Sequence, residues 1–254
     1  MLTGKVAIVT GAGQGIGRAI AIAMAKAGAR VSVVDLNPAT AENVAVELGE
    51  HGEPGLAIEC DVSQRDQVGK AVERTVSKWG GIDILVNNAH NLRDIRRSFL
   101  DTDEPHLLQH LTSGLFGTYY FLQESYRYLK ARKGSVVNVA SAAGVLGLPQ
   151  HFSYAATKEA IRATSRVVAK EWGPDGIRVN TICPAASETE AARPYFESLS
   201  DEGRDAYLAQ LPLRRFGTAD DVASVAVFLA SDASGYITGH TLMVDGGGTM
   251  DAAR

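Results

Sequence analysis

A glycine-rich turn between two apolar segments near the start of the chain constrains the fold more than any other feature. Residues 6–10 form an apolar run typical of a buried strand, and residues 18–27 are rich in alanine and isoleucine, as a buried helix is. The turn between them reads TGAGQGIG. A second apolar run at residues 31–34 ends at Asp35, so the pattern predicts a strand, helix and strand unit of the length found in nucleotide-binding sheets.

The same alternation continues to the end of the chain. We expect helices over residues 38–50, 64–78, 104–131, 154–171 and 219–230, and strands over residues 56–60, 82–86, 135–139, 178–183 and 241–244. Such alternation favours a parallel sheet covered by helices on both faces. We therefore predict an α/β protein with a three-layer, doubly wound, Rossmann-like fold and a parallel seven-stranded sheet. It forms a single domain over residues 1–254, with an insertion at about 185–212 that can close over a ligand as a lid.

Charge and cysteine content narrow the classes of partner and the cellular compartment that we expect. The net charge of −4 gives no electrostatic reason to expect nucleic acid or an anionic membrane, so a small molecule is the expected partner. Cys60 and Cys183 lie in apolar runs, which suits buried free thiols in a reducing compartment. Without a signal-like start or an apolar stretch of spanning length, we expect a cytoplasmic protein.

The glycine-rich turn predicts a dinucleotide site. Its glycines let the backbone approach a pyrophosphate at the positive end of a helix, although their spacing is not GxGxxG. Asp35 ends the second strand, where a carboxylate accepts hydrogen bonds from the ribose hydroxyls of NAD and repels the 2′-phosphate of NADP. The alternative for Asp35 is a solvated or helix-capping acid. We expect NAD to contact Gly11, Gly13, Gln14, Gly15, Ile16, Gly17, Asp35 and Leu36.

A serine, a tyrosine and a lysine form a candidate catalytic group. Lys158 follows Tyr154 by four residues, so on a helix both side chains share one face. We expect the nearby ammonium to stabilise the phenolate and so lower the tyrosine pKa from its ordinary value of about 10. Ser141, thirteen residues before Tyr154, can hydrogen-bond the same substrate oxygen. Because such spacings also arise by chance, these residues need corroboration.

That corroboration comes from a resemblance to the short-chain dehydrogenase/reductase family over nearly the whole chain. The resemblance covers Thr10 to Gly17, Asp61 and Val62, Asn87 to Ala89, Ser141, Tyr154, Lys158, Asn180, Pro184, Thr189 and the closing Val244 to Gly247. It implies that Tyr154 passes a proton to or from the substrate oxygen and that Ser141 stabilises the developing charge. Cofactor contacts are implied for Asp61 and Val62 at the adenine, Asn88 and Ala89 beside the sheet, Lys158 at the nicotinamide ribose, and Pro184 and Thr189 near the carboxamide.

The chain departs from the family pattern at three positions. His90 replaces a glycine, and it either narrows the site and touches ligand or turns outward; we expect the outward orientation. Ala185 replaces a second glycine, with a small expected effect. Gly114 stands where the family carries the asparagine of its proton relay. A water on the Gly114 carbonyl can still bridge to Lys158, so restoring the amide is expected to change turnover by no more than about tenfold.

Few residues stand out as candidate contacts to the substrate. We select His90, His151, Phe152 and Tyr195 as tentative substrate contacts, whereas three arginines after His90 are expected to be solvated surface. We expect no metal. The predicted function is an NAD(H)-dependent oxidoreductase that interconverts a secondary alcohol and a ketone, assembled as a homo-oligomer, tetramer or dimer. Rival hypotheses are a catalytically impaired NAD(H)-binding sensor or scaffold, and an enoyl reductase, which the position of Ser141 disfavours.

Overall fold

The computed structural model describes residues 1–189 and 193–250 and is built on one seven-stranded sheet. Its strands are β1 (Val6–Thr10), β2 (Arg30–Asp35), β3 (Leu56–Glu59), β4 (Ile84–Asn87), β5 (Ser135–Val139), β6 (Arg178–Pro184) and β9 (Thr241–Val244). Every pair is parallel, in the order β3-β2-β1-β4-β5-β6-β9. The predicted seven-stranded parallel sheet is therefore confirmed.

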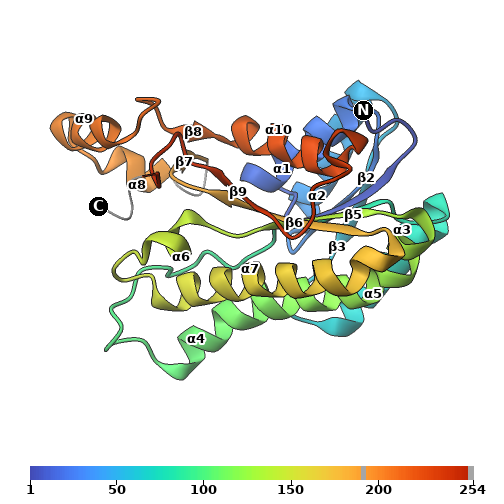
Figure 1. The fold of residues 1–254 in the computed structure, drawn as a ribbon, viewed down its shortest axis with the longest axis horizontal. Coiled ribbons are helices and arrows are strands. Elements are labelled where there is room, and N and C mark those ends of the chain that lie inside the picture. The colour runs from blue at the N-terminus through green and yellow to red at the C-terminus, as the bar shows by residue number, and fades with distance from the viewer. Residues whose placement is uncertain (190–192, 251–254) are drawn as a thin grey trace.

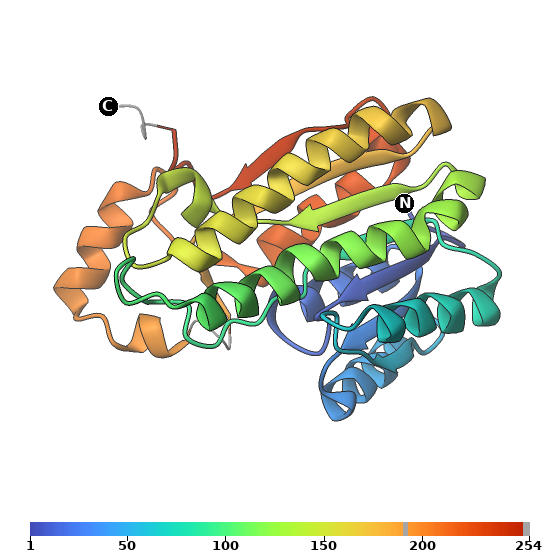
Figure 2. The same cartoon turned by 90° about the horizontal axis from the view of Figure 1, so that it is seen from below.

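Helices cover both faces of this sheet, as Figures 1 and 2 show. One face carries α1 (Gly15–Lys26), α2 (Pro38–Glu47) and α10 (Ala219–Ala230). The opposite face carries α3 (Arg65–Trp79), α5 (Gly117–Arg132) and α7 (Phe152–Trp172), which lie side by side in Figure 2. Because the central strands β1, β4 and β5 are buried along their whole length, they are almost continuously apolar instead of alternating.

Helix α1 begins at Gly15, three residues before the predicted start, because glycines allow the turn to pack closely on itself. A Cβ at Gly17 would lie 2.0 Å from the Gly11 carbonyl oxygen, so no larger residue fits there. Short 3₁₀ helices follow α2, α7 and α10 at Leu48–His51, Gly173–Asp175 and Asp232–Ser234.

The helix predicted over residues 104–131 is interrupted in the structure. It consists of α4 (Glu104–His110), a π-helical segment η2 (Leu111–Phe116) and then α5. π-helical turns are rare and often occur at functional sites. Gly114 lies within this segment and faces α7, so the local widening of the helix occurs where the expected relay residue is missing.

The insertion at residues 185–212 lies beyond the carboxyl ends of the strands (Figure 1). It contains β7 (Ser187–Glu188), α8 (Arg193–Glu197) and α9 (Asp201–Gln210), and β7 pairs with β8 (Gly217–Thr218). Within the insertion, the rings of Phe196 and Tyr207 pack on Phe216, with centroids 4.5 and 5.2 Å away, and so hold it together.

Among the described residues, no helix is long and apolar enough to cross a membrane. Cys60 and Cys183 are both buried free thiols, as the sequence predicts.

Candidate active site

The strand order reverses between β1 and β4, so the carboxyl ends of these two strands mark the switch point of the sheet. Ligands of doubly wound sheets bind at this kind of position. Gly11 has a φ of 61°, and a Cβ on it would lie 2.9 Å from the Ala89 Cα. Gln14 precedes α1 without a side-chain cap, so the first backbone N–H groups of this helix remain able to bind an anion. The turn therefore fits a dinucleotide pyrophosphate.

Asn88 joins the segments that follow β1 and β4 at this switch point. Its Nδ2 donates hydrogen bonds to the carbonyl oxygens of Thr10 at 2.9 Å and Gly11 at 3.1 Å. The Thr10 hydroxyl in turn accepts from the backbone N–H groups of Asn88 and Ala89, both at 3.0 Å. The predicted cofactor residues Asn88 and Ala89 thus border the glycine-rich turn directly.

Asp35 lies at the carboxyl end of β2, beside the same turn. Its carboxylate accepts hydrogen bonds from the backbone N–H groups of Gly13 at 2.8 Å and Asn37 at 3.0 Å. Leu36 is 68 % exposed and supplies no charge, and Arg18 is held by Glu47 at 2.6 Å. In the described part of the chain no ion pair involves Asp35, so its acceptor oxygens suit ribose hydroxyls.

Other predicted cofactor residues also follow strand ends. Asp61 comes after β3, and its Oδ1 accepts from the backbone N–H and the hydroxyl of Ser63 at 2.9 and 2.7 Å. Val62 is buried, and a Cβ on Gly117 would lie 2.9 Å from its Cγ2. Pro184 ends β6, and Thr189 follows β7, next to the undescribed residues 190–192.

The structure brings Ser141, Tyr154 and Lys158 together. Ser141 follows β5 and begins the short helix α6 (Ala142–Leu146), where its Oγ accepts from the Ala143 N–H at 3.1 Å. Tyr154 lies in the first turn of α7, close enough to Ser141 for the serine side chain to lower the Tyr154 pKa against the effect of burial. The buried Lys158 Nζ donates to the Val139 carbonyl at 2.8 Å and lies 5.7 Å from the Tyr154 ring centroid.

Burial dominates the protonation of these groups. Desolvation raises the pKa of Tyr154, and the hydrogen bond from Ser141 opposes it only in part. The expectation that the tyrosine pKa is lowered is therefore wrong for this structure, because burial removes the phenolate from water and Lys158 does not offset that effect. Desolvation also lowers the pKa of Lys158, to about 8, so this group can gain or lose a proton near neutral pH.

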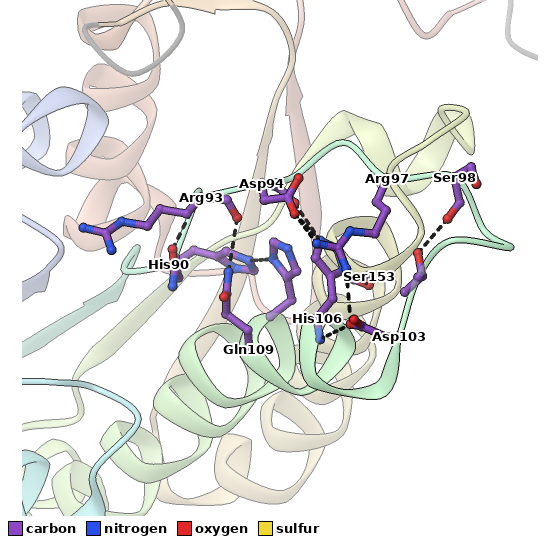
Figure 3. Close-up of polar contacts among 12 residues, drawn as sticks. His90, Arg93, Asp94, Arg97, Ser98, Asp103, His106, Gln109 and Ser153 are labelled. Atoms are coloured by element: carbon purple, nitrogen blue, oxygen red, sulfur yellow. Dashed lines mark hydrogen bonds and ion pairs between the residues drawn. The ribbon is translucent and has the colours of Figure 1, made fainter.

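His90 points into the site, so the expectation of an outward orientation is wrong. Its ring meets the Tyr154 ring edge-on, with centroids 5.1 Å apart, and its Nε2 lies 2.9 Å from His110 Nδ1 (Figure 3). His106 lies beside His110, at a ring centroid distance of 4.9 Å. Sequence reasoning missed His106 and His110, although their four-residue spacing places them on one face of α4.

The remaining substrate candidates lie at the edge of the site. His151 Nδ1 hydrogen-bonds the Pro149 carbonyl at 2.7 Å, and the Phe152 ring packs edge-on against Phe99 at a centroid distance of 4.7 Å. Tyr195 belongs to α8, but its side chain lies outside the described part of the structure. Arg97 pairs with Asp94 and Asp103, as expected for a surface arginine, and Arg93 points away from the histidine rings (Figure 3).

A cleft of about 960 Å³ opens between α1, α10 and the insertion, and Gly15, Glu188 and Thr189 are among its lining residues. The lining includes none of Ser141, Tyr154 and Lys158, so this cleft adjoins the glycine-rich turn without containing the three candidate catalytic residues. No group of histidine, cysteine or carboxylate side chains among the described residues could hold a metal ion.

Comparison with known proteins gives consistent matches over the whole chain. A family model described as enoyl-(acyl carrier protein) reductase matches residues 11–249. The chain is 41 % identical to a D-threitol dehydrogenase of Mycolicibacterium smegmatis over 98 % of this chain and 94 % of the relative. It is 39 % identical to a 12alpha-hydroxysteroid dehydrogenase of Clostridium sp., over 96 % of each chain. It is also 38 % identical to a 3-oxoacyl-[acyl-carrier-protein] reductase of Thermotoga maritima, over 97 % of this chain and 98 % of the relative.

A crystal structure from Sinorhizobium meliloti 1021, assigned to the short-chain alcohol dehydrogenases, superposes with a TM-score of 0.92. The two chains are 34 % identical, and the match covers 98 % of each.

Proposed function

Because the chain belongs to the short-chain dehydrogenase/reductase family, an oxidoreductase family of this fold, we propose that it interconverts a secondary alcohol and a ketone with NAD(H). The observation that carries the proposal is the convergence of Ser141, Tyr154 and Lys158 beyond the carboxyl end of β5. A serine and a tyrosine aimed at one oxygen suit the polarised C–O bond of an alcohol or ketone.

In the reducing direction, the Tyr154 hydroxyl donates its proton to the substrate oxygen, and the Ser141 hydroxyl donates a hydrogen bond to the same oxygen. A dinucleotide held at the glycine-rich turn and Asp35 would supply the hydride for the substrate carbon. Lys158 holds its ammonium near the phenolate that forms and returns a proton to it. Burial of Tyr154 favours this reaction, because a phenol that resists ionisation keeps its proton until the substrate oxygen takes it.

NAD(H) is our choice between the two nicotinamide dinucleotides that this family uses. The support is the carboxylate of Asp35 at the end of β2, with the uncharged Leu36 beside it. A ribose 2′-phosphate would lie against this carboxylate without a paired cation, which is unfavourable, whereas ribose hydroxyls can donate to it. Gly11, Gly13 and Gly15 would receive the pyrophosphate at the start of α1.

The relatives offer three substrate classes to compare: a polyol, a steroid alcohol and an acyl-carrier ketone. The purified protein should be assayed with NADH or NAD⁺ against one member of each class. We expect turnover with at least one hydroxyl or ketone substrate and none with an enoyl thioester, the substrate class named by the family model. Cofactor binding without turnover across the panel would favour the sensor hypothesis instead.

We also propose that the protein forms a homo-oligomer, a dimer or a tetramer. Phe116 at the end of η2, Tyr119 at the start of α5 and Val167 on α7 are large exposed apolar residues on neighbouring helices. Light scattering coupled to gel filtration measures the mass directly. A monomer at micromolar concentration would contradict this proposal without affecting the catalytic one.

A further inference from the structure

Two positions at which the chain departs from the family pattern, His90 and Gly114, share one buried space. A Cβ on Gly114 would lie 2.5 Å from Thr157 Cγ2, 2.7 Å from His90 Nδ1 and 2.8 Å from His90 Cε1. The imidazole of His90 thus occupies the volume that a side chain at position 114 would enter. The histidine that replaces the family glycine and the glycine that replaces the family asparagine are therefore a matched pair.

The His90 imidazole is a polar group that occupies a buried space. Its Nε2 is hydrogen-bonded to His110 Nδ1 at 2.9 Å, and its Nδ1 is buried with no hydrogen-bond partner among the described residues. Burial, then the charge of Lys158, then His110 hold the pKa of His90 well below its usual range. The ring is therefore neutral, with one nitrogen carrying a hydrogen and the other a lone pair.

His110 extends this contact away from Tyr154. Its side chain is fully buried, and burial followed by His106 lowers its pKa, so this ring is neutral as well. The second nitrogen of His110, Nε2, has no hydrogen-bond partner of normal geometry in the described structure. The backbone of Asp94 nevertheless lies close enough to raise the His110 pKa, against the larger effect of burial. Asp94 belongs to the exposed loop after β4, so His110 lies between His90 and a loop that contacts solvent, although the His110 ring itself is buried.

His106 has a different role, although it belongs to the same cluster. Its Nε2 must donate to the Asp94 carbonyl, 2.6 Å away, because a carbonyl only accepts. Its Nδ1 then accepts from the Ser153 hydroxyl at 2.9 Å. With both nitrogens bound, His106 fixes the loop and the start of α7, and it is not free to pass a proton.

We propose that His90 and His110 form a proton relay between the Tyr154 and Lys158 pair and solvent, replacing the asparagine-dependent relay of the family. This inference rests on the proposed function. The titratable and charged groups that face the relay are Lys158 and Tyr154 from α7, Cys183 from β6, His106 from α4 and Asp94 from the loop.

In the reducing direction the relay supplies one proton for each turnover. Lys158 gives a proton to the Tyr154 phenolate and regains one, through a water at the Gly114 carbonyl, from His90 Nδ1–H. As that bond breaks, His90 Nε2 takes the hydrogen of His110 Nδ1, and the buried His110 Nε2 takes one from a water that enters at the Asp94 loop. Only N–H and O–H bonds change and both rings end neutral, each with its hydrogen moved from Nδ1 to Nε2, and a passage in the oxidising direction restores the first tautomers. Alcohol oxidation runs the same path backward.

The decisive experiment first removes the His90 ring. It then replaces the histidine relay with the amide of an asparagine at position 114. His90→Gly should lower kcat by about tenfold or more while the KM values stay within about threefold, and added imidazole should restore much of the loss. The double variant His90→Gly with Gly114→Asn removes the imidazole from the path of the amide, so that only the Thr157 methyl, 2.5 Å from the new Cβ, still has to move. It should recover turnover to within about tenfold of wild type, without a response to imidazole. His110→Phe keeps a ring but no proton carrier, and it should lower kcat as His90→Gly does and increase the solvent deuterium isotope effect.

His106→Gln is the matched control, because it removes a neighbouring histidine that the relay does not use. His106→Gln should show the same solvent isotope effect as wild type, and added imidazole should leave the rates of both proteins unchanged. Nitrogen-15 spectra of histidine-labelled protein give a readout independent of turnover: His90 and His110 should both be neutral at neutral pH, and charged rings would overturn the relay.

The possible failures are distinguishable. If wild type shows no turnover at all, the proposed function fails. If wild type turns over and His90→Gly is unaffected, the relay fails alone. If His90→Gly loses activity but neither imidazole nor the double variant restores it, His90 has only a packing role and the relay is again overturned.

Discussion

The His90 ring lies where a side chain at Gly114 would begin, with its Nδ1 only 2.7 Å from the position of a Cβ on that glycine. Contacts this short between an unbonded Cβ and a ring atom require the ring to move. The residues are 24 positions apart in the sequence, but the end of β4 and the π-helical segment η2 bring them together. The consequences of changing either one must therefore depend on the other.

Gly114→Asn in the wild-type background should destabilise the protein and lower its activity. This replaces the sequence-based expectation of a change within about tenfold, because overpacking a buried site typically costs about 1–3 kcal/mol. Gly69→Ala is the matched control, since a Cβ at this glycine in α3 meets nothing within 4 Å. Thermal and urea unfolding should show Gly114→Asn less stable than wild type and Gly69→Ala slightly more stable. Equal stability of Gly114→Asn and wild type would contradict the packing described here.

Tyr154→Phe should reduce kcat by roughly a hundredfold or more while the affinity for NADH is retained, because the substitution removes only the proton donor. Steady-state rates and NADH fluorescence titration test the two parts separately. Tyr126→Phe is the control, since this tyrosine lies on α5 and not on α7, its hydroxyl donates to Asp175 at 2.6 Å, and its loss should leave turnover intact. Undiminished turnover in Tyr154→Phe would remove the basis of the proposed mechanism.

Asp35 should make NAD(H) preferred over NADP(H) by more than about tenfold in kcat/KM. Replacing Asp35 with serine and Leu36 with arginine removes the repelling carboxylate and adds a cation for the 2′-phosphate, so the preference should move toward NADP(H). Titration of both cofactors against both proteins measures this shift. Should the ratio stay constant, the ribose does not lie beside β2.

The pH dependence should have opposite signs in the two reaction directions. Lys158 has its pKa lowered to about 8 by burial, so its ammonium is present below that pH and its amine above it. Ketone reduction consumes a proton and should slow as the pH rises through about 8, whereas alcohol oxidation should accelerate over the same interval. Initial rates at saturating substrate across this range are the measurement. Parallel profiles in both directions would argue against Lys158 as the proton donor to Tyr154.

The sequence by itself determined the architecture. Buried parallel strands and amphipathic helices leave local signals in the chain, so the strands at residues 6–10, 135–139 and 241–244 and the helix at 219–230 have the predicted bounds. The glycine-rich turn, Ser141, Tyr154 and Lys158 were also recognisable, because each depends on a residue type at a fixed position along one strand, turn or helix.

Only the tertiary structure decided how the departures from the family pattern relate to one another. The inward orientation of His90, its bond to His110 and the π-helical turn at Gly114 all depend on contacts between β4, α4 and α7, which are distant in sequence. The raised pKa of Tyr154 likewise follows from burial by several elements and not from its four-residue spacing to Lys158. Hydrophobic periodicity indicates which face of a helix or strand is buried. Which element covers that face, and how completely water is excluded from it, is decided only when the elements pack together.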